Sequence, residues 1–198
     1  MDVLGKNIEV QESLTYLLWK AVIDRPLALF ALITLSPLIA IIAILVPLDS
    51  PGGPVFGQAR VGKNGRVFKC YKFRTMHVNN DDSSYREYVK SLINHGVPYT
   101  KDNNGRPVYK ICDDDRVTRL GAFLRKTNLD EIPQLINVTR GEMSCVGPRQ
   151  DTPYAVAMYQ DWHRKRLSRM PGITGLWQVS DRSRLSFDQM VQLGIQYR

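Results

Sequence analysis

Two adjacent carboxylates, Asp130 and Glu131, are the residues in this sequence whose types and spacing best suit catalysis. They open a predicted helix, because Pro133 is tolerated only in the first turn of a helix. The buried stripe of that helix is then expected to comprise Ile132, Leu135 and Ile136. Acidic residues are also favoured at helix N-termini for capping and for the helix dipole, so the pair alone leaves a structural role open.

Basic residues around the pair suit phosphoryl transfer. Arg125 and Lys126 precede the carboxylates, and a Gly-Pro-Arg turn ending at Arg149 follows them. In phosphoryl transfer a cation or Mg²⁺ neutralises the transferring group, while a carboxylate binds metal or attacks phosphorus. The sequence has no GxxxxGK[ST] loop, no GxGxxG fingerprint and no serine hydrolase elbow, and its three histidines are scattered without metal-ligand spacing. Phosphoryl transfer without a P-loop or a Rossmann fingerprint is therefore the chemistry these residues favour.

A glycine-rich segment, PGITGLWQVSDRS at 171–183, is a second candidate for a binding element. Gly172 and Gly175 would let the backbone approach a phosphate or nucleotide closely, beside Gln178 and Arg182. The same glycines could instead make a tight turn over a buried tryptophan, and the sequence leaves both interpretations open.

The composition is that of an ordinary globular chain with a basic charge. Of 198 residues, 43% are apolar and 23% charged, which excludes disordered, collagenous and disulfide-stapled classes. The three cysteines lie far apart without a Cys-x-x-Cys pair and indicate a reduced compartment. With 27 Lys+Arg against 19 Asp+Glu the net charge is +8, so anionic partners are expected: nucleic acid, anionic lipid or nucleotide phosphates.

An uncharged apolar run from Pro26 to Leu48, 23 residues long, meets the length criterion for crossing a bilayer. It is too long, and lies too far into the chain, for a signal peptide. Ser36-Pro37 interrupts it near its middle, where the proline removes a backbone hydrogen bond and the serine can satisfy part of the freed backbone. Basic residues, which prefer the cytoplasm, flank the run on both sides. We therefore favour a re-entrant helix that returns to the same face over a kinked spanning helix.

After this run the sequence predicts a hairpin, a surface excursion and further helices. Asn64-Gly65 lies between alternating residues and indicates a β-hairpin turn. The acidic, turn-rich stretch 77–115 is interpreted as a surface excursion with one helix near 85–94. A basic amphipathic helix is expected at 116–127, either on a membrane interface or packed on a small core.

The expected fold class is α+β, mostly helical, with a re-entrant membrane helix broken at Ser36-Pro37, interfacial amphipathic helices and a small β-hairpin. Residues 1–50 are predicted to form an N-terminal interfacial segment and the re-entrant helix. Residues 51–198 are predicted to form a catalytic domain on the cytoplasmic face, interrupted by the excursion at 77–115.

Five segments, taken together and in this order, resemble the bacterial sugar transferases, the monotopic phosphoglycosyl transferases that start lipid-linked glycan assembly. They are Asp24-Arg25 with the Ser36-Pro37 apolar segment, YKFRTM at 71–76, LRKTNLDEIPQLINV around Asp130-Glu131, VGPR at 146–149 and PGITGLWQVSDRS at 171–183. The resemblance covers nearly all of the chain from about Asp24 onward, except the acidic excursion.

The resemblance implies transfer of a sugar 1-phosphate from a UDP-sugar to a polyprenyl phosphate, usually undecaprenyl phosphate, with release of UMP. This is the first membrane step of exopolysaccharide, O-antigen or glycoconjugate synthesis. Asp130 matches the family nucleophile, which forms a covalent phosphosugar intermediate and lies near Mg²⁺, and Glu131 matches its partner, which helps to activate the lipid phosphate. The phosphate- and nucleotide-binding positions of the family match Lys72, Arg125, Arg149, Gln178 and Arg182.

The resemblance also implies a location. Ser36 and Pro37 match the break that makes the family's membrane helix re-entrant, which would place the protein on the cytoplasmic face of the bacterial inner membrane. The expected partners are a UDP-sugar, polyprenyl phosphate and membrane lipid, with no nucleic acid. The identity of the sugar and a homodimer both stay open.

The sequence departs from the family pattern at three places. Family members often read Pro-Arg-Pro where this chain has Pro148-Arg149-Gln150, and Gly194 stands where an Asp is common. The chain stops at Arg198, where members commonly continue, which favours a shortened chain. Two alternatives are kept: a membrane-anchored basic domain that binds anionic lipid or nucleic acid without catalysis, and a membrane-tethered nucleotide hydrolase that uses no lipid acceptor.

Overall fold

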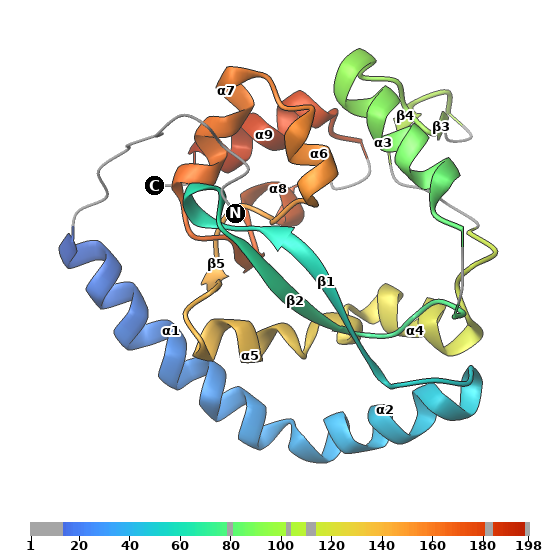
Figure 1. Ribbon diagram of the computed structural model, residues 1–198, viewed down its shortest axis with the longest axis vertical. Helices are drawn as coiled ribbons and strands as arrows, with labels where there is room; N and C mark the ends of the chain where they lie inside the picture. Colours follow the sequence, from blue (N-terminus) through green and yellow to red (C-terminus); the bar gives the residue numbers. More distant parts are fainter. Residues whose placement is uncertain (1–13, 79–80, 102–103, 110–113, 181–183, 197–198) are drawn as a thin grey trace.

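Two long apolar helices lie along one side of the molecule, and shorter helices and strand pairs fill the other side (Figure 1). The structure is a computed structural model that describes residues 14–78, 81–101, 104–109, 114–180 and 184–196. Its helices are α1 Leu14–Thr34, α2 Ser36–Asp49, α3 Ser83–His95, α4 Arg119–Thr127, α5 Gln134–Thr139, α6 Pro153–Ala157, α7 Asp161–Arg164, α8 Leu176–Val179 and α9 Phe187–Gln196. Its strands are β1 Val55–Val61, β2 Val67–Phe73, β3 Thr100–Lys101, β4 Pro107–Val108, β5 Ser144–Val146 and β6 Gly172–Thr174. Its 3-10 turns are η1 Lys63–Gly65, η2 Leu129–Glu131 and η3 Lys165–Ser168.

The predicted break in the apolar run is confirmed. Leu35 separates α1 from α2, and Pro37 stands in the first turn of α2, where a proline is tolerated. The Ser36 hydroxyl donates to the carbonyl of Ile33 at 2.7 Å, which is the carbonyl that Pro37, lacking an N–H, leaves without its helical donor. The axis bends by 64° at this point.

The bent pair has the length and composition of a membrane segment, whereas its separate helices do not. Among the described residues, no single helix is long and apolar enough to cross a bilayer, but Leu18–Thr34 and Ser36–Asp49 meet that test together. Large apolar side chains stay exposed along both helices, including Phe30, Ile33 and Ile44. Exposed apolar surface on this scale is typical of a protein or membrane contact.

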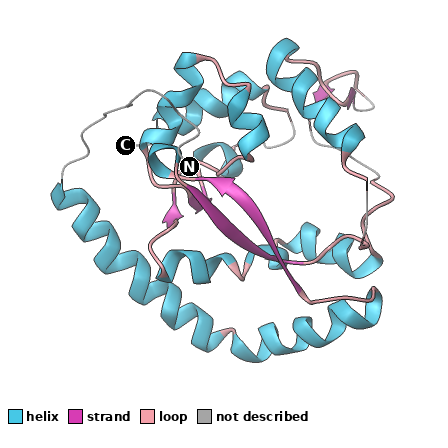
Figure 2. Ribbon diagram, viewed as in Figure 1, coloured by secondary structure: helices cyan, strands magenta, loops and turns pink. Residues whose placement is uncertain are grey.

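The mostly helical α+β class is confirmed, and the strands in the described part of the chain form three separate pairs (Figure 2). The predicted hairpin is β1 and β2, which pair antiparallel, and its turn contains Asn64 and Gly65 at φ of 55° and 79°. The helix expected in the excursion is α3, and the basic amphipathic helix is α4. The parallel pair of β5 and β6 was not predicted, because each strand is three residues long and has no periodic signature.

The C-terminal end of α2 is tied to the elements that carry the candidate site. Arg74, just after β2, donates to the carbonyls of Ser50 and Pro51, the latter at 2.9 Å. The Asp49 carboxylate accepts from the backbone N–H of Leu120 in α4 at 3.3 Å. An apolar cluster joins the same elements through the buried side chains of Ile42, Val46, Phe73 and Leu124.

The N-terminal helix is tied to β5 by a polar contact. The Asp24 carboxylate accepts from the Ser144 hydroxyl at 2.5 Å and from the Cys145 N–H at 3.3 Å. Ala28, Val138 and Met143 pack together beside this contact. A third, larger cluster lies away from α1 and α2 and joins α3, α6, η3 and α9 around Val156 and Val191.

Two details of the prediction around Asp130 and Glu131 were wrong. The carboxylates lie on the separate 3-10 turn η2 and do not open α5, which begins only at Gln134 with Pro133 as its N-cap. The buried residues of α5 are Gln134, Asn137 and Val138, whereas the apolar residues assigned to its buried stripe, Ile132, Leu135 and Ile136, are half-buried. Gln134 and Asn137 face inward because the Asn137 amide hydrogen-bonds to the backbone of β2 and the Gln134 amide accepts from Gln150.

Candidate active site

Three segments far apart in the sequence bring the carboxylates and two cations together. Lys72 comes from β2, Asp130 and Glu131 from η2, and Arg149 from the turn that follows β5. The Lys72 ammonium lies 2.8 Å from the Glu131 carboxylate, and the Arg149 guanidinium lies 2.7 Å from the same oxygen. The four side chains that sequence analysis assigned to catalysis and phosphate binding in these segments therefore form one cluster.

Glu131 is clamped by these two cations. Its side chain is 12% exposed, and burial alone would raise the pKa of its carboxyl. The charges and hydrogen bonds of Arg149 and Lys72 outweigh that burial and lower the pKa to about 2. Glu131 in turn raises the pKa of Arg149 against the opposite effect of burial. At neutral pH, Glu131 is a fixed anion that orients two cations.

Asp130 is held differently from its neighbour. Its nearest cation is Lys72, whose ammonium lies 3.9 Å from its carboxylate, beyond hydrogen-bond distance. Within the described residues, the Asp130 side chain accepts no hydrogen bond. Burial and the neighbouring Glu131 charge raise the pKa of Asp130, with burial the larger cause, although Lys72 opposes them. Asp130 is thus a carboxylate of raised pKa that has one long ion pair, to Lys72, and accepts no hydrogen bond from the described residues.

Burial also acts on Lys72. Its side chain is 20% exposed, and loss of solvent together with the charge of Arg149 lowers the pKa of its ammonium, although Glu131 and Asp130 oppose the shift. A partly dehydrated ammonium interacts more strongly with a phosphate oxygen than a solvated one does.

Asn137 fixes the strand that carries Lys72 against the helix that follows the carboxylates. This fully buried amide accepts from the Tyr71 N–H at 3.1 Å and donates to the Lys69 carbonyl at 2.8 Å, as a neighbouring strand would do. Leu129 and Ile132, on either side of the carboxylates, pack against the apolar cluster that contains α2. The distance from Lys72 to η2 is therefore set by backbone contacts and by the apolar helix pair.

Arg125 lies next to this cluster on α4. Its Nε donates to the Thr75 hydroxyl at 2.9 Å, and its charge acts on Asp130. The approach of α4 to the chain after β2 depends on Gly121, because a Cβ there would collide with the Thr75 backbone. Arg125 accordingly lies near enough for its charge to act on Asp130, and its phosphate-binding role stays a prediction.

The two remaining predicted residues, Gln178 and Arg182, belong to the glycine-rich segment near the C-terminus. Gln178 is buried on α8 and donates to the Ile173 carbonyl in β6 at 3.2 Å, a hydrogen bond that ties it to the β5–β6 pair and not to the carboxylates. Arg182 lies outside the described residues. The nucleotide-binding roles of both stay predictions.

Comparison with known proteins identifies the family. The family described as bacterial sugar transferase matches residues 15–198. The chain belongs to the bacterial sugar transferase family. It is 44% identical over 161 residues to the galactosyl transferase CpsE of Streptococcus agalactiae, 79% of this chain and 33% of that protein. It is 41% identical to the exopolysaccharide production protein ExoY of Sinorhizobium fredii, over 88% of this chain and 74% of that protein.

The name of a third relative includes a lipid phosphate. The undecaprenyl-phosphate galactose phosphotransferase of Salmonella typhimurium is 39% identical over 177 residues, which cover 87% of this chain and 34% of that protein. The chain therefore spans about a third of the streptococcal and Salmonella relatives and about three quarters of ExoY.

Of the two adjacent carboxylates, Asp130 fits a magnesium site that substrate would complete. Among the described residues, no group of three His, Cys, Asp or Glu side chains is arranged to hold a metal ion. Mg²⁺ is commonly held by one or two carboxylates together with substrate phosphates and water, and the unengaged oxygens of Asp130 fit that mode. Glu131 fits less well because Lys72 and Arg149 occupy its Oε1.

Sequence reasoning missed several residues that support the site. Asn137, Asp24 and Arg166 are buried or half-buried polar side chains that bind the backbone of distant segments. Arg166 stands in a basic run, RKRLSR, that looks like a solvated surface, and no local signal separates it from its exposed neighbour Lys165. The Asp24-Arg25 pair carries a signal only as part of the family pattern.

Proposed function

We propose that this sugar transferase moves a sugar 1-phosphate from a UDP-sugar to undecaprenyl phosphate or a similar polyprenyl phosphate, with release of UMP, through a covalent intermediate on Asp130. One observation carries the assignment: of two adjacent carboxylates, Glu131 is clamped by Lys72 and Arg149, while the buried Asp130 accepts no hydrogen bond from the described residues. The names of the relatives support the donor and acceptor classes.

In the first step an Asp130 oxygen attacks the phosphorus that bears the sugar. A bond forms between that oxygen and phosphorus, the bond to the UMP oxygen breaks, and UMP leaves with the electron pair. In the second step an oxygen of the lipid phosphate attacks the same phosphorus, and Asp130 leaves as a carboxylate. The products are UMP and a polyprenyl-diphospho-sugar, and each step exchanges one P–O bond for another.

The basic residues stabilise the negative charge that develops in both steps. Lys72 and Arg149 contact Glu131, and the charge of Arg125 acts on Asp130. We assign the phosphate oxygens of the donor to these three cations. Glu131, with a pKa of about 2, is too weak a base to take a proton at neutral pH, so its contribution is to hold Lys72 and Arg149 in place. Mg²⁺ bound by Asp130 and the diphosphate would supply further charge neutralisation.

The location that we propose is the cytoplasmic face of the bacterial inner membrane, with α1 and α2 re-entrant. The lipid phosphate lies at the membrane surface and the UDP-sugar arrives from water, so the nucleophile must lie at the boundary between them. The packing of Leu129 and Ile132 on the cluster around α2 places the Asp130 turn beside the apolar helix pair. The exposed apolar faces of α1 and α2 are consistent with lipid contact.

The function is tested by UMP release from the full chain with Mg²⁺, undecaprenyl phosphate and a panel of UDP-sugars, beginning with UDP-galactose because two relatives are named for galactose. We expect release from one donor and its loss in Asp130→Asn, since a neutral amide cannot supply the attacking carboxylate. Asp115→Asn, at an exposed acidic residue, is the matched control and should keep full activity.

The same assay separates the intermediate from its alternatives. Without lipid acceptor, the covalent route predicts a burst of UMP no larger than the amount of enzyme, followed by a halt. Continuous release of UMP without acceptor would favour the membrane-tethered hydrolase. If no UMP at all were released without the lipid, the covalent step would be excluded. Full turnover by Asp130→Asn would remove Asp130 from the nucleophile role.

A further inference from the structure

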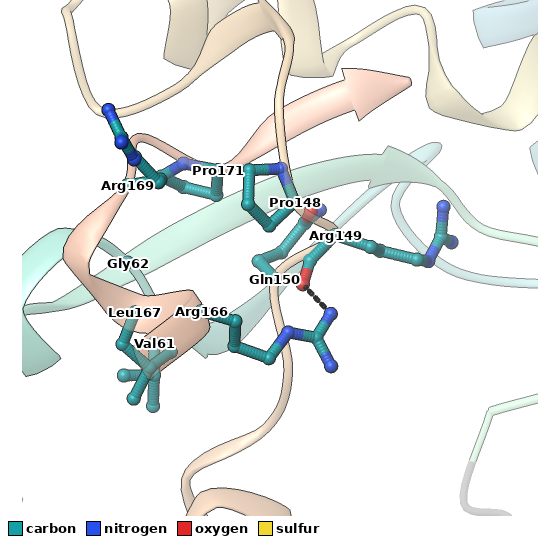
Figure 3. A pocket seen from close by; sticks show the side chains of 9 residues that line it. All are labelled: Val61, Gly62, Pro148, Arg149, Gln150, Arg166, Leu167, Arg169 and Pro171. Carbon is teal, nitrogen blue, oxygen red and sulfur yellow. Dashed lines mark hydrogen bonds between the residues drawn. The ribbon is translucent and has the colours of Figure 1, made fainter. Parts of the chain in front are cut away.

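The turn that carries Arg149 is held from behind by a buried arginine. Arg149 follows β5, which pairs with β6 so closely that a Cβ on Gly147 would lie 2.9 Å from the backbone nitrogen of Gly172. The side chain of Arg149 extends to Glu131, while its carbonyl faces the opposite direction, toward Arg166 on η3 (Figure 3). The Arg166 Nη2 donates to that carbonyl at 2.7 Å.

Arg166 is itself fixed on its second side. Its side chain is 4% exposed, and its Nη1 donates to the Asp151 carboxylate at 3.1 Å and to the Tyr159 hydroxyl at 3.3 Å. Tyr159 also donates to Asp151, and the Asp151 backbone carbonyl accepts from Val61 at the end of β1. The guanidinium therefore joins a carboxylate anchored to the hairpin with the carbonyl of a residue in the active site.

Only arginine satisfies this geometry. A guanidinium has several N–H donors in one rigid plane, so it can hold a carboxylate with one terminal nitrogen and a carbonyl with the other. A lysine at this position would keep the charge for Asp151 but would present its donors from a single flexible nitrogen. The arrangement is costly if it serves stability alone, because a buried ion pair often contributes little over an apolar core.

We propose that Arg166 is a positioning residue for this reaction: it holds the Arg149 backbone so that the Arg149 side chain reaches Glu131. The inference rests on the function proposed above and assigns to Arg166 no contact with substrate. The position of Arg166 fits this role, because Arg166 contacts the carbonyl of Arg149 while the guanidinium of Arg149 contacts Glu131. A displacement of about 1 Å at a positioning contact can cost about a hundredfold in rate.

The test is a double-mutant cycle in kcat/KM for UMP release, measured on the full chain with undecaprenyl phosphate and radiolabelled UDP-sugar. Arg166→Met alone should lower kcat/KM by about tenfold to a hundredfold. In an Arg149→Ala background the same substitution should change it by less than about threefold, because no guanidinium is left to position. Lys165→Met is the matched control: it makes the same charge change at an exposed neighbour and should keep the wild-type rate.

The melting temperature of each variant is measured beside the rate, and rates are compared below the lowest transition. If Arg166→Met fails to fold, Arg166→Lys takes its place in the same cycle. The inference would be overturned if the losses in kcat/KM from Arg166→Met and Arg149→Ala multiplied in full in the double variant, since Arg166 would then be a purely structural residue. An unchanged kcat/KM in Arg166→Met would overturn it as well. Absence of UMP release from the wild-type chain would count against the proposed function instead, so the two failures are distinguishable.

Discussion

The clamp on Glu131 predicts a loss of stability on its neutralisation, and a pH dependence of that loss. Glu131→Gln removes the negative charge and leaves Lys72 and Arg149 facing a neutral amide. The site is largely shielded from water, so the two cations are left without the anion of Glu131 in a poorly solvated environment. Removal of one partner of a buried ion pair is strongly destabilising. The variant should fold less stably than the wild type at neutral pH.

The magnitude follows from the pKa of Glu131. A fall from the ordinary value of 4.5 to about 2 corresponds to about 3 kcal/mol of preferential stabilisation of the folded carboxylate, at about 1.4 kcal/mol per pKa unit. For a chain of this size, about 3 kcal/mol lowers the melting temperature by roughly 6–12 °C. A glutamine that still accepts one hydrogen bond from Lys72 or Arg149 would bring the result toward the lower end.

The sign of the pH dependence is fixed by the direction of the shift. Because the folded-state pKa lies below the ordinary one, the stabilisation is fully present above pH 4.5 and is lost as the pH falls toward about 2. The difference between wild type and Glu131→Gln should shrink from about 3 to about 2 kcal/mol between pH 7 and pH 3.5. Thermal unfolding in detergent micelles without divalent cation measures it, and Glu87→Gln, at an exposed position, is the control.

Two results would refute this reasoning. A Glu131→Gln variant as stable as the wild type at pH 7 would mean that the cations lose nothing when the carboxylate is neutralised. A difference that stays constant from pH 7 to pH 3.5 would mean that the loss comes from packing and not from the charge of Glu131.

The break between α1 and α2, and the way these two helices are proposed to lie in the membrane, give two further predictions. Ser36→Ala removes the hydroxyl that donates to the Ile33 carbonyl, and it should lower the free energy of unfolding by about 0.5–1.5 kcal/mol in thermal unfolding. Thr34→Val is the control and should cost less, because the Phe30 carbonyl that accepts from the Thr34 hydroxyl keeps its backbone donor. If the pair is re-entrant, Thr15→Cys and Arg66→Cys in a cysteine-free chain should both react with an impermeant maleimide from the cytoplasmic side of membrane vesicles. Reaction from opposite sides would show a crossing.

Local chemistry determined much of the fold from the sequence alone. The break at Ser36-Pro37 was predictable because proline lacks an N–H, and the hairpin because Asn64-Gly65 adopts positive φ at low cost. Both signals act over a few residues and need no partner elsewhere in the chain. The same reasoning placed α4 correctly but made the acidic pair open the next helix, whereas the pair lies on η2 and α5 begins only at Gln134.

The buried face of α5 shows where local pattern fails. Apolar periodicity assigned Ile132, Leu135 and Ile136 to the core, yet the fully buried residues of α5 are Val138 and two polar residues, Gln134 and Asn137. A polar side chain is buried when distant groups make its hydrogen bonds, here the β2 backbone for Asn137 and the Gln150 side chain for Gln134. Periodicity contains no information about such partners.

The sequence by itself determined that Asp130 and Glu131 stand side by side among basic residues, and its family resemblance indicated a phosphosugar reaction. Tertiary structure decided which carboxylate is clamped and which is left unengaged, because that depends on Lys72, 59 positions before Glu131, and on Arg149, 18 positions after it. It also decided that Arg166 is buried behind the active site. Side chains so far apart in the chain meet only when packing of α2, β2 and the β5–β6 pair fixes their distances, and no short-range signal encodes that convergence.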